Sequence, residues 1–372
     1  MATVAETVTI KTAEVPPSRP AAVPERSMAL DAYRGLIMIL LVSHGFGFGE
    51  LKDHPVWGFF ARQVDHVQWE GMVLWDLIQP AFMFMVGVAL PFAMAKRTRS
   101  GATFQDNLLH VLKRCAVLIF LSQLFTVVHS GRIEFGLINV LSQIAFTYLI
   151  CFLLMQLPMA AQVSGAVGLL AVHWAMFVAF PGPDGAFSKE GNVGQVMDHW
   201  LLGRNYSGYY VTINFVSSAV TTMFGVWMGD WMRKSPDVRR TLRILLWSAG
   251  GSFVGGVALA FLNPMVKRIW TASFTLASAG WVLLGLAAMV WMVDVKGWRR
   301  FAFPMVVVGM NSIFAYCVFQ LMRGSIHRAV GVFTGNFGWL GTLAPVAHAC
   351  ATLAVIWWMC YWLYQRRAWV KI

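Results

Sequence analysis

Long apolar runs separated by short polar segments fill the chain from about residue 27 to its end. A helix of about 20 apolar residues, rising about 1.5 Å per residue, matches the roughly 30 Å hydrocarbon core of a bilayer. Ten runs approach this length, near residues 30–49, 74–95, 109–129, 137–156, 162–180, 210–232, 242–262, 271–293, 301–322 and 342–364. The pattern predicts an all-α polytopic membrane protein with about ten transmembrane helices in one bundle.

Residues 1–26 have a different composition, rich in Ala, Pro, Val and Glu. They lack the basic and then apolar build of a signal peptide, and they offer little apolar surface to bury in a core. We therefore predict a disordered tail over residues 1–26 and one multi-span transmembrane domain over residues 27–372.

Composition and charge narrow the classes of partner and of site that the chain can have. Hydrophobic residues make up 58% of the 372 residues and charged residues 12%, with a formal net charge of +12. Lys and Arg lie in short clusters between apolar runs, which is the distribution that orients membrane proteins. This distribution excludes nucleic acid as a partner. Membrane lipid is the expected partner of the apolar runs. The five Cys are odd in number and show no C-x-x-C spacing, so neither a disulfide framework nor a zinc site is indicated, and no metal is expected.

The distribution of Lys and Arg also predicts an orientation. Ten spans return the chain to its starting side, and with the N-terminus inside, the inner loops and C-terminal tail hold fourteen Lys and Arg against nine in the outer loops. Because basic residues are enriched on the cytoplasmic side, both termini are expected to be cytoplasmic. The loop that carries His66 then lies outside.

Candidate chemistry is concentrated where this loop enters the segment at residues 74–95. Asp76 lies at the start of that segment, where a carboxylate is unfavourable in lipid unless it is paired or faces water. Asp65, Glu70 and Asp76 all lie within ten residues of His66. A carboxylate could hold the Nδ1 proton of His66 and leave Nε2 free as a base or nucleophile, as acyl-transfer histidines require.

Four stretches of sequence carry a resemblance to a known family. They are Leu30-Asp31-x-x-Arg34-Gly35; His66-x-x-Trp69-x-Gly71-x-x-x-x-Asp76-Leu77-x-x-Pro80; Lys267-Arg-Ile-Trp270-Thr-Ala-Ser273; and Gly309-Met-Asn311-Ser-Ile-Phe-Ala-Tyr316. In these motifs the chain resembles the heparan-α-glucosaminide N-acetyltransferase family of transmembrane acyltransferases, from about residue 27 to about residue 320. It departs from the family at Glu70, where the lysosomal enzymes have Asn, and at Gln143, where many members have Arg.

The resemblance implies an enzyme that moves an acetyl group from cytoplasmic acetyl-CoA, its co-substrate, to an amino sugar or other glycan acceptor on the outer face. It places the catalytic histidine at His66, and Asp76 is the expected orienting group. N-acetyl transfer is favoured over O-acetyl transfer, and the inner membrane of a bacterium is the expected location. His66 could remove a proton from the acceptor, or it could carry the acetyl group itself, in which case the kinetics would be ping-pong.

Further residues are candidates for binding the two substrates. Arg34, Gln143 and Asn311 are expected on the donor, since CoA phosphates attract cations, although Arg34 could instead pair with Asp31 one turn earlier. On the acceptor side the candidates are Glu70, Asn263, Lys267, Arg268, Trp270 and Ser273. Trp270 could stack on an apolar sugar face, or the Lys-Arg-x-Trp group could be a plain interfacial anchor. Asn263, Ser273 and Asn311 are candidate donors to the oxyanion of the acetyl carbonyl.

Two other interpretations stay open at this point. Polar residues inside spans are also typical of transporters and flippases of small polar or glycan substrates, which form a second functional class. The spacings Gly225-x-x-x-Gly229 and Gly251-x-x-x-Gly255 favour close helix packing, either inside the fold or between the subunits of a homodimer.

Overall fold

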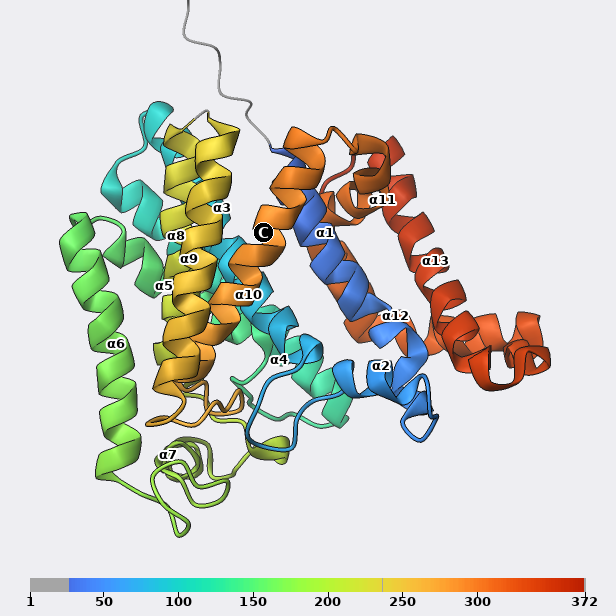
Figure 1. The fold of residues 1–372 in the computed structure, drawn as a ribbon, viewed down its shortest axis with the longest axis horizontal. Coiled ribbons are helices and arrows are strands. Elements are labelled where there is room, and N and C mark those ends of the chain that lie inside the picture. Colours follow the sequence, from blue (N-terminus) through green and yellow to red (C-terminus); the bar gives the residue numbers. More distant parts are fainter. Residues whose placement is uncertain (1–26, 236, 371–372) are drawn as a thin grey trace, which may run out of the picture.

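The computed structural model describes residues 27–235 and 237–370, and these residues fold almost entirely into helices (Figure 1). Within the described ranges the sole β-type contact is an isolated bridge between Gly182 and Gly185. The predicted all-α class is therefore confirmed. The tail predicted over residues 1–26 lies outside the described residues.

Thirteen α-helices follow one another along the described part of the chain. Their bounds are α1 Met28–Val42, α2 Gly58–Gln63, α3 Ile78–Arg99, α4 Phe104–Ser130, α5 Val140–Leu154, α6 Met159–Ala179, α7 Val193–Leu202, α8 Asn214–Lys234, α9 Val238–Leu259, α10 Ala272–Val290, α11 Arg299–Met310, α12 Ser312–Thr334 and α13 Ala344–Gln365. Short 3₁₀ turns η1 Gly45–Leu51, η2 Leu74–Leu77, η3 Ser207–Tyr209 and η5 Gly335–Leu343 connect them, and the π-helical turn η4 Trp291–Val295 follows α10.

Eight stretches of the described residues are long and apolar enough to cross a membrane, which confirms a multi-pass membrane protein. The last of these, Ser312–Gln365, contains two helices, α12 and α13. The 15 residues of α5 rise only about 22 Å, less than a usual span. The predicted number of ten spans therefore stays a prediction.

The ninth predicted segment, residues 301–322, differs from the structure. The chain leaves helical geometry at Asn311 (φ −122°, ψ 36°), so that α11 ends at Met310 and α12 continues to Thr334. The Asn311 carboxamide Oδ1 accepts a hydrogen bond from the Val370 backbone N–H at 3.1 Å, near the end of the chain. Apolar residues continue through this break, so the hydrophobic pattern alone gives no sign of it.

Helices α3, α8 and α10 lie in the middle of the bundle, and α6 lies at its edge with most of its side chains exposed (Figure 1). The first small-residue motif explains the close contact of α3 with α8. A Cβ atom on Gly225 would lie 2.0 Å from the Phe84 carbonyl oxygen, and one on Gly229 would lie 2.3 Å from that of Val88. This motif packs inside the fold, whereas Gly251 of the second motif has open space beside it.

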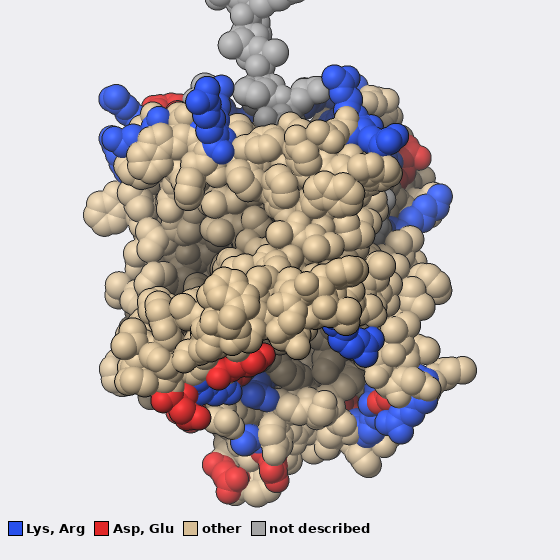
Figure 2. Space-filling model, turned by 90° about the vertical axis from the view of Figure 1, so that its right-hand side faces the viewer, with Lys and Arg blue, Asp and Glu red and all other residues tan. Residues whose placement is uncertain are grey.

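The charged side chains divide the surface into bands. Figure 2 shows Lys and Arg gathered toward the two ends of the molecule, with an uncharged band between them. Such a band is typical of the surface that meets lipid tails. Asp76 and Arg99 mark the two ends, because α3 connects them across the bundle.

Candidate active site

The site begins with the turn that leads into α3. Asp76 lies in η2, and its Oδ2 accepts a hydrogen bond from the Val73 backbone N–H at 3.3 Å. This bond satisfies one of the free N–H groups at the start of a helical turn, and it fixes the carboxylate facing back toward the preceding loop. Asp76 is 1% exposed, so its charge needs partners inside the protein.

His66 is the first partner. Its Nδ1 lies 2.6 Å from Asp76 Oδ1, which is the pairing expected from the sequence. Because a carboxylate only accepts hydrogen bonds, the proton of the neutral imidazole is on Nδ1, and Nε2 carries the lone pair. The His66 side chain is 36% exposed, and its Nε2 makes no hydrogen bond to another residue in the described part of the chain. That atom is available to a substrate.

Lys267 is the second partner, and it comes from the loop between α9 and α10. Its Nζ lies 3.3 Å from Asp76 Oδ1 and 3.3 Å from His66 Nδ1. Both nitrogens donate to the same carboxylate oxygen, so Asp76 holds the imidazole and the ammonium together. Burial lowers the pKa of Lys267 to about 8, while the Asp76 charge opposes this shift. The three charged or titratable groups form one cluster, which we call the histidine cluster.

Arg268 fixes the two loops that build this cluster. Its guanidinium donates to the backbone carbonyls of Gly208 and Val67, the latter at 3.3 Å, and lies 5.5 Å from the centre of the Tyr210 ring. The Gly71 N–H also donates to the Met265 carbonyl at 2.8 Å. The loop that carries His66 is therefore bound directly to the loop that carries Lys267.

A surface ion pair holds the other side of the His66 loop. The Asp65 carboxylate pairs with Lys52 and accepts a hydrogen bond from the His66 backbone N–H at 2.9 Å. The hydrogen bond from Lys52 lowers the pKa of Asp65 despite partial burial. Asp65 therefore positions the His66 backbone, whereas Asp76 holds the imidazole.

Two cavities adjoin the middle of the bundle. The first, of about 560 Å³, is lined by Gln79, one turn beyond Asp76, and by Tyr210, beneath Arg268; we call it the outer cavity. The second, of about 410 Å³, lies between α1, α3, α5 and the α11–α12 break, and we call it the inner cavity. Val140 and Tyr316 line both, so the two cavities adjoin one another.

The donor candidates lie at different places relative to these cavities. Arg34 lines the inner cavity together with Arg114, and it also lies 3.6 Å from Asp31, as the alternative interpretation expects. Gln143 is 1% exposed and accepts a hydrogen bond from Gln79 Nε2 at 2.8 Å. Asn311 is fully buried at the helix break and lines neither cavity.

The acceptor candidates are mostly internal. Trp270 is 1% exposed and packs edge-to-face on Phe274 with ring centres 5.3 Å apart, so in this conformation no sugar can stack on it. Ser273 is buried and donates to the Pro264 carbonyl at 3.0 Å, and Asn263 is also buried. Among these candidates Glu70 is exposed to solvent, and Arg268 is partly exposed.

Sequence reasoning missed two features of the site. The sequence places Lys267 among the acceptor candidates, and the structure places it in contact with Asp76 and with His66, which lies 201 residues earlier in the chain. Tyr210 lines the outer cavity, and none of the sequence motifs includes it. In the sequence, Lys267 and Arg268 stand next to each other just before a predicted span. A basic pair in this position can be an interfacial anchor, or one of its residues can be a buried partner of Asp76, and the sequence does not distinguish the two.

Comparisons with known proteins agree with the motifs. Residues 26–186 match a family described as a domain of unknown function, DUF5009. Over 369 positions the chain is 21% identical to human (Homo sapiens) heparan-alpha-glucosaminide N-acetyltransferase, covering 80% of this chain and 53% of the human protein. The chain resembles an acetyltransferase. The mouse (Mus musculus) protein of that name is 20% identical over 365 positions, covering 80% of this chain and 54% of its own length.

These matches confirm the resemblance predicted from the sequence motifs. The chain spans about half the length of the curated relatives it matches. The aligned part includes most of the helical bundle, since it covers 80% of this chain.

Proposed function

We propose that this protein is a membrane acetyltransferase that moves an acetyl group from acetyl-CoA to an amine on a glycan, with His66 as general base. The observation that carries the proposal is the 2.6 Å hydrogen bond between His66 Nδ1 and the buried carboxylate of Asp76. It fixes the tautomer and leaves Nε2 of the partly exposed His66 side chain free to accept a proton. The similarity to N-acetyltransferases supports the choice of reaction.

The chemistry follows from this arrangement. The acceptor amine attacks the thioester carbonyl while Nε2 removes its proton, the new N–C bond forms, and the C–S bond breaks to release CoA. The proton on Nε2 then neutralises the departing thiolate, which restores the neutral imidazole. Asp76 stabilises the imidazolium while it exists, and Lys267 balances the carboxylate charge when the imidazole is neutral.

The two cavities suit the two substrates. Arg34 and Arg114 in the inner cavity would hold the phosphates of the CoA nucleotide, since guanidinium groups form strong paired hydrogen bonds with phosphate. The acceptor would enter the outer cavity, next to Gln79 and Tyr210. The acetyl end of the donor would then pass the shared boundary at Tyr316 to reach the histidine.

The proposed orientation has both termini in the cytoplasm and the histidine cluster outside, as the Lys and Arg distribution indicates. A cysteine introduced at the exposed residue Gly185, in the loop between α6 and α7, should react with an impermeant maleimide added to intact cells. Reaction only after permeabilisation would reverse the orientation.

Thiol release tests the activity. The purified full chain should release free CoA thiol from acetyl-CoA when glucosamine is added, and hydroxylamine should leave the product intact because it is an amide. A hydroxylamine-sensitive product would indicate O-acetyl transfer instead. Absence of any thiol release, together with uptake of a labelled glycan into vesicles that contain the protein, would favour the transporter alternative.

A further inference from the structure

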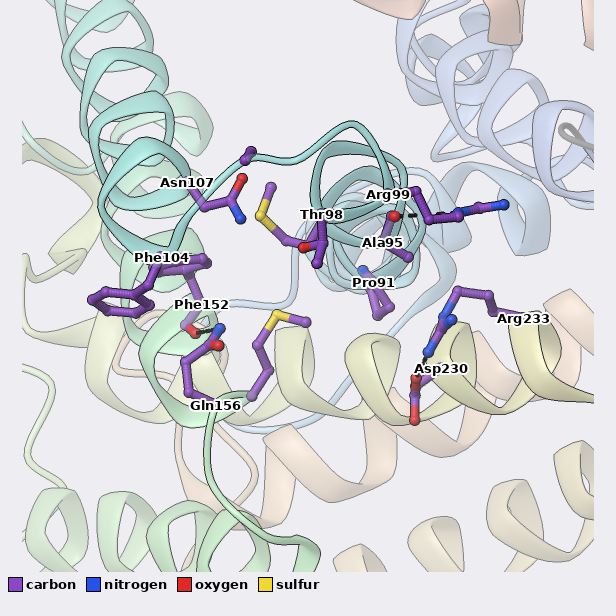
Figure 3. Close-up of a pocket in the computed structure, with 13 residues that line it drawn as sticks. Pro91, Ala95, Thr98, Arg99, Phe104, Asn107, Phe152, Gln156, Asp230 and Arg233 are labelled. Carbon is purple, nitrogen blue, oxygen red and sulfur yellow. Dashed lines mark hydrogen bonds and ion pairs between the residues drawn. The ribbon is translucent and has the colours of Figure 1, made fainter.

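Figure 3 shows a third cavity, of about 620 Å³. It lies at the end of α3 that carries Arg99, whereas the histidine cluster lies at the start of that helix. The cavity is formed where α3, α5 and α8 end and α4 begins, and the proposed reaction does not use it. We call it the basic-end cavity. Residues that line it include Met94, Arg99, Phe104, Asn107, Phe152 and Arg233.

The basic-end cavity is separate from the inner cavity. Helix α3 contributes Val86, Ala89 and Ala93 to the inner cavity but Met94, Ala95 and Thr98 to the basic-end cavity. With 3.6 residues per turn, these two sets of positions lie on opposite faces of the helix. A molecule in the basic-end cavity therefore does not occupy the route proposed for acetyl-CoA.

The charged half of this cavity has an excess of positive charge. Arg233 donates to Asp230 at 2.8 Å, and Lys234 donates to the same carboxylate at 2.5 Å, so Asp230 is already compensated. The Arg233 Nε atom is buried without a hydrogen-bond partner among the described residues. Within residues 27–235 and 237–370, Arg99 on the other helix forms a hydrogen bond only to the Ala95 carbonyl of its own turn, at 3.3 Å.

Asn107 adds a neutral donor to the two guanidinium groups. Its Oδ1 accepts a hydrogen bond from Arg97 Nε at 2.8 Å, which leaves the carboxamide N–H groups of Asn107 for the cavity. Figure 3 shows Arg99 and Arg233 on one side of the cavity and Phe104 and Phe152 on the other. The two rings stack with centres 5.7 Å apart.

This division matches a ligand with an anionic head and an apolar body. The cavity lies at the ends of three helices that form or adjoin membrane spans, where lipid headgroups are found, and Phe104 at its edge is 51% exposed. Farther along the same helix Leu109 and Leu112 are also exposed, which continues an apolar surface away from the headgroup level. Arg–phosphate pairs provide both charge and direction, and basic pockets between spans bind anionic headgroups.

We propose that the basic-end cavity binds the phosphate of an anionic phospholipid, which Arg99 of α3 and Arg233 of α8 hold while its acyl chains lie along α4. The site is separate from acetyl transfer, so it does not depend on the proposed function. A lipid bound there would connect α3 with α8, because Arg99 belongs to α3 and Arg233 to α8.

Lipid retention and thermal stability test this proposal on the full chain in detergent. Phosphatidylglycerol should bind and raise Tm, phosphatidylcholine should have a much smaller effect, and Arg99→Gln with Arg233→Gln should weaken phosphatidylglycerol binding by about tenfold or more. Arg99→Lys with Arg233→Lys keeps the charges but loses the paired geometry, so its binding should lie between the two. Arg300→Gln, an exposed arginine outside the cavity, is the matched control and should bind like the parent.

Several results would overturn the proposal. Equal binding of phosphatidylglycerol by the parent and the double Gln variant would place the lipid elsewhere, as would an equal loss in the Arg300→Gln control. A Tm increase of the same size with inorganic phosphate alone would indicate a site for a free anion rather than a lipid. If the double Gln variant fails to fold, the double Lys variant decides, because binding equal to that of the parent would exclude the paired phosphate contact.

Discussion

The two ends of α3 organise their charges in opposite ways. At the end that carries Asp76, Lys267 contacts both Asp76 and His66, and it lies 201 residues after His66, so its bonds join parts of the chain that are distant in sequence. At the other end the bonds are short-range in sequence: Arg99 contacts its own helix turn, Asp230 pairs with Arg233 and Lys234 three and four residues on, and Arg97 donates to Asn107 ten residues on. The contacts of Lys267 hold two loops together and so fix the position of the His66 imidazole. The contacts of Arg99 and Arg233 stay within one or two helix turns, so we expect their guanidinium groups to rearrange around a ligand.

Burial accompanies this difference. Asp76 and the Lys267 side chain are 1% and 5% exposed, whereas the side chains of Arg233 and Asp230 are 32% and 30% exposed. Removing one member of a buried pair leaves an uncompensated charge, but removing one member of a solvated pair leaves a charge that water can stabilise. Substitutions at the two ends should therefore differ in size and in kind.

The largest expected effect is on catalysis at His66. His66→Ala should abolish acetyl transfer while the variant still inserts and folds, because the side chain lies at the loop surface rather than in the packed core. Thiol release from acetyl-CoA, measured per folded molecule, gives the result. His199→Ala, which changes an exposed histidine of α7, is the control and should keep full activity.

Activity of His66→Ala within a few-fold of the parent would mean that another group is the base. In that case the histidine cluster would be a structural feature. Loss of both the folded protein and the activity would be resolved by His66→Gln, which keeps a side chain that can bond to Asp76 but provides no base of comparable strength.

The next effect concerns Asp76. Asp76→Asn keeps the shape of the side chain, but it no longer holds the proton on Nδ1 or stabilises an imidazolium, so the rate should fall by about 10²–10⁴. The affinity for acetyl-CoA should change much less, because Arg34 and Arg114 line the inner cavity rather than this cluster. Turnover per folded molecule and Tm should be measured together. A folded variant with normal turnover would remove Asp76 from the mechanism.

Much of this contrast between the two ends could be predicted from the sequence. The apolar runs predict the helices because burial in lipid requires backbone hydrogen bonds within each segment. The His66–Asp76 contact could be predicted because both residues lie on one short connection between a loop and a helix. The break at Asn311 could not, since apolar residues continue on both sides of it.

The position of Lys267 could not be predicted for a different reason. Nothing local distinguishes a lysine that snorkels to the membrane surface from one that folds inward to a carboxylate. The choice depends on how the loop between α9 and α10 packs on the His66 loop, through contacts such as Gly71 to Met265. Likewise Trp270, an expected surface aromatic, turns inward at a backbone with φ 51° and packs on Phe274.

Lys267→Met should therefore reduce stability strongly. It leaves the buried Asp76 carboxylate without its cation, and breaking a buried pair in this way costs about 3–5 kcal/mol. Lys52→Met is the matched control, because the Lys52–Asp65 pair belongs to the same loop but its side chains are 55% and 50% exposed. It should cost less than about 1 kcal/mol. Equal losses of Tm in the two variants would contradict the buried pairing.

Lys267 also gives stability a dependence on pH. Its pKa in the folded protein is about 8, against an ordinary value of 10.5, so between these values the unfolded chain binds the Lys267 proton more tightly than the folded protein does. Stability from this group therefore rises as the pH increases from about 8 to about 10.5, and below pH 8 the full penalty of burying the charge is present. The difference in Tm between the parent and Lys267→Met should change over this window, whereas Lys52→Met should follow the parent. A difference that stays constant across the window would show that Lys267 keeps an ordinary pKa.

The smallest effect is expected at the other end of α3. Arg233→Gln removes one of the two cations that contact Asp230, but Lys234 remains at 2.5 Å and all three side chains are partly solvated. Exposed pairs of this kind contribute about 0–1 kcal/mol, so in lipid-free detergent the loss of stability should fall in that range and turnover should not change. Tm and thiol release, measured beside Lys267→Met, provide the comparison. A loss as large as that of Lys267→Met would mean that the local bonds near Arg99 and Arg233 fix the bundle as firmly as the long-range bonds at His66, and the contrast between the two ends would no longer hold.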